Sequence, residues 1–175
     1  TPSNSSAASD VYKRQIYIYL GVVYMSNRFK AVDIAKWFLA YNRLKIDETG
    51  ADLISNLKLQ KLLYYAQGVY LAITGEKLFS DDILAWKHGP VVEAVYYTYK
   101  SNGSNGIDYD ENFDFSKFDK KTENILEAVY DNFAQYSAWK LREMTHQETP
   151  WQNTPQSEVI DPNLIRDYFE ENYVE

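Results

Sequence analysis

The sequence contains no cysteine, which excludes disulfide bonds and thiolate chemistry and fits a protein of a reducing compartment. It also lacks an HExxH zinc motif, a glycine-rich phosphate-binding loop and a GxSxG nucleophile elbow. Each of these motifs marks a major class of enzyme, so none of those classes is indicated. No internal repeat or low-complexity tract is present either.

Histidine is scarce, with only His88 and His146 in the whole chain. A metal site could combine both with Glu143 or Glu148, but distant segments would have to converge. The alternative is structural: His88 precedes a Gly-Pro turn, and His146 follows a predicted helix end, where an imidazole can bond free carbonyl groups. We favour the structural interpretation and predict no catalytic residue, no metal and no cofactor.

A long apolar run is also missing. The segment from Ile16 to Tyr24 follows two basic residues, as in a signal peptide or anchor, but about ten residues cannot span a bilayer that needs about 20. No small-residue cleavage site follows it. Ser5 to Gln15, SSAASDVYKRQ, resembles the translation of a sequencing-library adapter. We therefore expect residues 1–24 to be a non-native leader and a single domain to occupy residues 25–175, beginning at Met25.

Positive charge is in the minority, because 18 Lys and Arg residues face 25 Asp and Glu residues, for a formal net charge of −7. An acidic protein binds nucleic acid poorly by itself and suits a basic protein partner, although the charge could also serve solubility alone. Hydrophobic residues, by contrast, make up 45% of the chain and aromatic residues 16%. This composition, at 175 residues, supports one domain with a proper core.

The stretch from Asn56 to Lys100 organises the rest of the chain. Its first half has apolar residues at a spacing of three and four, which indicates a helix: Leu59, Leu62, Leu63, Ala66, Val69, Tyr70 and Ile73. The opposite side of this helix is barely polar, so we expect other helices to bury it. Ser55 or Asn56 is suited to cap its start, and Gly75 to end it.

An extended run from Ile83 to Lys87 leads into the turn His88-Gly89-Pro90. Pro90 suits the first position of a helix, where its missing N–H costs nothing, so we expect a helix from Pro90 through Tyr99. Further helices are predicted in the ranges 32–44, 122–133, 137–144 and 161–169, with a linker at 47–52 and a loop at 101–106. The predicted fold class is mainly α, a compact single-domain helical bundle with at most a small β-strand pair.

Three separated segments, KLQKLLYYAQG, AWKHGPVVEAVY and LREMTHQETPW, together resemble the Panacea domain, the antitoxin family that includes SocA-like and phage-associated GepA-like proteins. The likeness runs roughly from Met25 to Ile160. The residues that match its W-x-x-GP and TH-x-E-x-PW patterns are Trp86, Gly89, Pro90, His146, Glu148 and Trp151. The resemblance implies a cytoplasmic bacterial or phage protein that neutralises a toxin.

Two features of the organising stretch suggest contact with a partner. Lys58 and Lys61 place positive charge in the first turn of a helix, against its macrodipole. They either grip an acidic group on a partner or reach water over apolar neighbours. Six tyrosines cluster in the stretch, and adjacent pairs on a helix cannot all point inward, so some should lie at an interface; the alternative is a tyrosine-rich core. The hypothetical contact residues are Lys58, Lys61, Trp86, His88, Tyr96, Tyr97 and Tyr99.

From the resemblance we expect an antitoxin, not an enzyme, that neutralises a toxin encoded by a neighbouring gene through direct protein–protein binding. One alternative, which SocA-like membership also permits, is an adaptor that delivers a client to a cellular protease. A second alternative is a hydrolase that uses His88 or His146. We expect no membrane association and no direct nucleic-acid binding, because no helix-turn-helix precedes the organising stretch and the charge is acidic.

Overall fold

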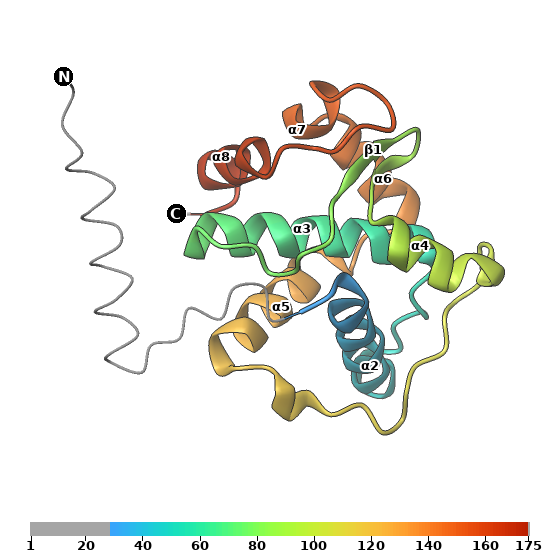
Figure 1. Ribbon diagram of the computed structural model, residues 1–175. Helices are drawn as coiled ribbons and strands as arrows, with labels where there is room; N and C mark the ends of the chain where they lie inside the picture. Colours follow the sequence, from blue (N-terminus) through green and yellow to red (C-terminus); the bar gives the residue numbers. More distant parts are fainter. Residues whose placement is uncertain (1–28, 175) are drawn as a thin grey trace, which may run out of the picture.

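Helix α3, Asn56–Thr74, is the element against which most of the others pack. Figure 1 shows it crossing the middle of the molecule, with α8 on one side and α2 and α5 on the other. The computed structural model describes residues 29–174, and the leader predicted over residues 1–24 lies outside them.

In chain order the elements are α2 (Ala31–Thr49), α3, β1 (Leu84–Trp86), β2 (Gly89–Val91), α4 (Glu93–Tyr99), η1 (Lys100–Asn102), η2 (Phe115–Lys117), α5 (Lys120–Phe133), α6 (Ala138–His146), α7 (Thr149–Gln152) and α8 (Pro162–Asn172). The mainly α prediction is confirmed, and so is the small strand pair. Strands β1 and β2 form the two-stranded antiparallel sheet that the prediction allowed.

The core surrounds α3 because that helix is apolar on nearly every side. Leu59, Leu62, Leu63 and Ala66 are all fully buried, and so is most of the rest of the helix. A Cβ atom at Gly68 would meet the ring of Phe169. Glycine therefore lets α8 approach α3 closely, at the place where the two helices pack.

Local signals place several helix ends where the sequence predicts them. Ser55 caps α3 by accepting a hydrogen bond from the Lys58 N–H at 3.4 Å, and Gly75, with φ of 74°, ends the helix. Asp161 caps α8, and Pro162 takes its first position. Helix α2 differs: it continues past the predicted end to Thr49, where Gly50 stops it, so the predicted linker at 47–52 begins inside a helix.

Pro90 does not begin a helix, as predicted, but lies in β2 opposite Ala85. Helix α4 begins only at Glu93. The Pro90 carbonyl points away from β1 and accepts a hydrogen bond from Lys61. Because the nitrogen of an antiparallel strand residue faces the same way as its carbonyl, the missing N–H of Pro90 costs no bond between the strands.

Strand β1 is paired on its other edge as well. Ala85 donates to the Glu158 carbonyl at 2.9 Å and accepts from the Ser157 N–H at 2.7 Å, and Ile160 donates to the Ile83 carbonyl at 2.8 Å. The segment 157–160 therefore acts as a third, irregular strand. These hydrogen bonds join the hairpin to the segment between α7 and α8.

Candidate partner-binding surface

Polar side chains of α3 hold the outer edge of the hairpin. Gln60 accepts from the Val92 N–H at 2.9 Å, and Lys61 Nζ donates to the Pro90 carbonyl at 2.8 Å. Asn56 donates to the Tyr96 carbonyl at 3.1 Å and accepts from Gln60 Nε2 at 3.0 Å. Gln60 and Lys61 satisfy backbone groups at the outer edge of the hairpin that a neighbouring strand would otherwise bond, and Asn56 bonds a carbonyl of α4. Together they fix the hairpin and α4 against the core.

Lys61 therefore does not lie at a surface. It is fully buried, and burial, followed by the positive charge of Arg142, lowers its pKa to about 7. Both sequence interpretations place the amino group of Lys61 at the surface, but the side chain is fully buried and bonds a carbonyl inside the fold. We exclude Lys61 from the contact surface.

Lys58 has a similar internal role. Its Nζ atom donates to the Ala134 carbonyl at 2.6 Å, at the end of α5. The side chain is half-buried, and burial lowers the pKa of its ammonium group. Helix α3 has almost no exposed side to add to a contact surface, since Ile73 is its one exposed residue.

Adjacent tyrosines behave differently on the two helices. Tyr64 and Tyr65 are both fully buried on α3, so this pair belongs to the core, as in the alternative of a tyrosine-rich core. On α4, Tyr97 is 59% exposed. Its neighbour Tyr96 is half-buried and packs edge-on against Trp86. Tyr99 packs against the core. The predicted aromatic surface is thus centred on Tyr97.

A second exposed aromatic side chain lies on α6, beside the hairpin turn. Trp139 is 56% exposed, and the guanidinium of Arg142 lies over its ring at 4.6 Å. Arg142 Nε donates to His88 Nδ1 at 3.2 Å. Burial and the nearby positive charges of Arg142, Lys87 and Lys61 lower the pKa of His88, so its imidazole is neutral at pH 7. No sequence pattern singles out Trp139, and Arg142 lies within the segment LREMTHQETPW without a role assigned from the sequence.

The two motifs of the resemblance meet at the hairpin. Trp151 Nε1 donates to the Trp86 carbonyl at 2.9 Å, and the His146 ring stacks on Trp151 with centroids 3.9 Å apart. His146 is the last residue of α6, and its Nε2 has no hydrogen-bond partner within residues 29–174. His146 thus packs on the side chain that bonds β1, and its Nε2 does not make the bond to a free carbonyl that the sequence suggested within residues 29–174.

Two further residues of the motifs, Gly89 and Glu148, lie in the interior. A Cβ atom at Gly89, where φ is 97°, would meet Lys61 Nζ and Thr145 Oγ1, so only glycine fits between α3 and α6. Glu148 Oε1 accepts from the hydroxyls of Tyr65 and Tyr173, each at 2.8 Å. Burial raises the pKa of the Glu148 carboxyl, and these tyrosine hydrogen bonds oppose the rise.

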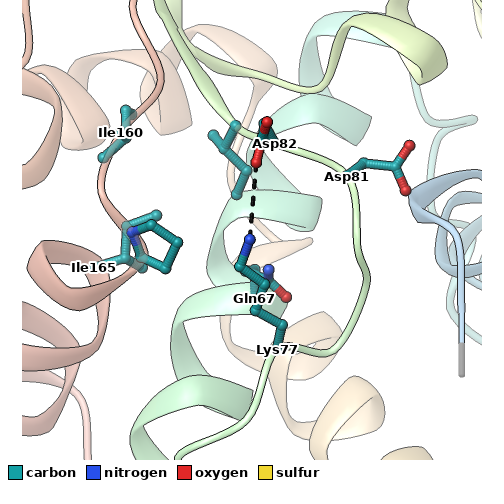
Figure 2. A pocket seen from close by; sticks show the side chains of 8 residues that line it. Gln67, Lys77, Asp81, Asp82, Ile160 and Ile165 are labelled. Carbon is teal, nitrogen blue, oxygen red and sulfur yellow. Dashed lines mark ion pairs between the residues drawn. The ribbon is translucent and has the colours of Figure 1, made fainter. Parts of the chain in front are cut away.

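The hydrolase alternative would need His88 or His146 to lie among metal-binding partners or beside a cavity. In the part of the chain that the structure describes, no three His, Cys, Asp or Glu side chains come together as metal ligands do. Figure 2 shows a cavity between α3 and α8, beside the ion pair of Lys77 and Asp82 at 3.7 Å. Its volume is about 10 Å³, roughly the space of one water molecule. His88 and His146 do not line it.

The length and apolar character needed to cross a lipid bilayer are not found together in any helix of residues 29–174.

Comparison with known proteins gives two matches. The family model described as "Antitoxin SocA-like, Panacea domain" matches residues 59–152, more than half of the chain. Antitoxin SocA of Caulobacter vibrioides (strain NA1000 / CB15N) is 50% identical over 50 residues, which cover 29% of this chain and 27% of that protein. The alignment therefore spans about a quarter of the relative's length. No solved structure matches the chain.

Proposed function

Because the chain belongs to the family of SocA-like antitoxins with a Panacea domain, we propose that it is an antitoxin. In this proposal it acts in the cytoplasm and neutralises a protein toxin, encoded by a neighbouring gene, through direct binding. The match to antitoxin SocA over about a quarter of that protein's length supports this proposal.

The observation that supports direct binding best is the exposure of two large aromatic side chains on either side of one rigid hairpin. Tyr97 on α4 and Trp139 on α6 are each more than half exposed, although most aromatic side chains of this protein pack inside. Exposed tyrosine and tryptophan are the residues that most often contribute hot spots of binding energy. We define this surface as the hairpin face: Trp86, His88, Tyr96, Tyr97, Trp139 and Arg142.

The hairpin face is held in place before any partner arrives. Gln60 and Lys61 hold β2 from α3, and Trp151 holds β1 from α7. A surface that is already ordered loses less conformational entropy on binding. Rigid anchoring therefore favours tight recognition of a protein partner over an induced rearrangement.

The experiment is co-expression with the product of the neighbouring gene in a host whose growth that product arrests. Wild type should restore growth. The double variant Tyr97→Ala, Trp139→Ala should restore less, because one hot-spot aromatic contributes roughly 2 kcal/mol or more, about thirtyfold in affinity. Tyr136→Ala is the control, since Tyr136 is 36% exposed and is not among the residues that define the hairpin face.

Three outcomes separate the possibilities. Failure of wild type to rescue growth would contradict the antitoxin proposal. Full rescue by the double variant would place the contact elsewhere on the molecule. If rescue is accompanied by a fall in the partner's abundance that needs a host protease, the protein acts as an adaptor; a constant abundance agrees with neutralisation by binding.

A further inference from the structure

Two neighbouring side chains, His88 and Trp139, position the guanidinium group of Arg142. Its Nε atom donates to His88 Nδ1 at 3.2 Å, and its Cζ atom lies 4.6 Å from the centre of the Trp139 ring. Arg142 and Trp139 are three residues apart on α6, so they share one face of that helix. Within the described residues, no hydrogen bond or ion pair engages the two terminal nitrogens of Arg142.

The charges around this group are of one sign. Lys87 is exposed beside His88, and the buried Lys61 lies behind it; both act on His88 together with Arg142. Glu143 is the next residue on α6, but its carboxylate lies 3.8 Å from Lys140. Within residues 29–174, no carboxylate is among the groups that shift the pKa of His88, so a protein with a net charge of −7 presents a local positive site here.

Such a site fits a carboxylate. An arginine offers two parallel N–H donors that match both oxygens of a carboxylate, and ordering the guanidinium beforehand reduces the entropy lost on binding. The exposed ring of Trp139 adds an apolar floor next to the charge. A nucleic-acid backbone also carries anionic oxygens, but the net negative charge of the protein would repel a long polyanion.

We propose that Arg142, positioned by His88 and Trp139, is the receptor for an Asp or Glu carboxylate on an acidic segment of the partner protein. This inference rests on the proposed antitoxin function and specifies the chemistry of its contact. Arg142 makes the contact, whereas His88 orients the guanidinium.

The test measures the dissociation constant between the purified protein and the neighbouring gene's product. Arg142→Gln should weaken binding about tenfold or more, because a hydrogen bond between charged groups is worth roughly 1.5–3 kcal/mol. Arg142→Lys keeps the charge but not the two-pronged geometry, so it should recover only part of the loss. Arg166→Gln is the matched control: Arg166 on α8 pairs with Asp167 at 2.6 Å, and its variant should bind like wild type.

A charge exchange identifies the occupant. Arg142→Glu should abolish binding, and one Asp→Lys or Glu→Lys variant of the partner should restore it. Equal melting temperatures of the Arg142 variants and wild type would show that they fold. If wild type binds and Arg142→Gln binds equally well, this inference is wrong while the antitoxin proposal stands. If wild type binds no partner, both fall. Binding of a DNA or RNA oligonucleotide that depends on Arg142 would also overturn it.

Discussion

The interior around α3 and the hairpin face place the same residue types in opposite environments. Tyr64 and Tyr65 are fully buried, whereas Tyr97 is 59% exposed. Lys61 is buried and bonds a carbonyl, whereas the terminal nitrogens of Arg142 bond no other group within residues 29–174. The difference lies in coverage: α3 is surrounded by α2, α4, α5, α6, α8 and β2, while α4 and α6 each keep a side without neighbours. The type of a side chain alone therefore does not decide whether it is buried in the core or available at the surface.

The largest effect on stability is expected for Tyr65→Ala. The Tyr65 ring stacks on Phe133 with centroids 3.8 Å apart, and its hydroxyl donates to Glu148. Removing a buried aromatic ring costs about 3–5 kcal/mol, which urea denaturation would measure. Tyr65→Phe is the control, because it keeps the ring and removes only the hydroxyl; a loss as large as that of the alanine variant would show that packing is not the cause.

Lys61→Met should change how stability depends on pH. The folded lysine loses its proton from about pH 7, whereas the unfolded one keeps it to about pH 10.4. The unfolded state therefore binds more protons in this window, and the free energy of unfolding of wild type should rise from pH 7 to 9.5 by about 3 kcal/mol from this group alone.

Methionine cannot titrate, so Lys61→Met should lose that rise; denaturation at several pH values checks it. The window stops at pH 9.5 because the buried tyrosines, whose pKa values are raised, begin to act above it. Wild-type and variant profiles that run parallel would contradict the burial of an unpaired lysine.

Glu148→Gln should also change how the free energy of unfolding depends on pH, by less than Lys61→Met and in the opposite direction. Burial raises the pKa of the Glu148 carboxyl, so between the unfolded and folded pKa values the folded state binds more protons. Stability from this group therefore falls as pH rises from the acid range. The glutamine variant, neutral throughout, should gain relative to wild type as the pH rises above the unfolded pKa of about 4.3. Glu143→Gln, at an exposed position, serves as control.

Tyr97→Ala should barely affect stability. An exposed side chain without a special role changes the free energy of unfolding by less than about 0.5 kcal/mol, although the same substitution should weaken growth rescue. Thermal melts and the co-expression assay measure the two effects separately. A drop in melting temperature comparable to that of Tyr65→Ala would remove the contrast between the two regions and give Tyr97 a core role.

Signals confined to one or two helical turns could be read from the sequence. Ser55, Gly75, Asp161 and Pro162 end or begin helices as predicted, because a cap depends only on residues within hydrogen-bonding reach along the chain. The apolar character of α3 likewise predicted its burial. Pro90 was misplaced because a proline without an N–H suits both a helix start and an outward-facing strand position, and local sequence cannot choose between them.

The sequence by itself determined a mainly helical domain, its principal buried helix and its family. Tertiary structure alone decided which polar residues turn inward and which stay available. The position of Lys61 depends on its carbonyl partner, Pro90, which lies 29 positions away in the chain. Arg142, His88 and Trp139 meet because α6 packs against β2. The fate of a charged side chain depends on the desolvation and partners that distant segments supply, and no periodicity along the chain encodes them.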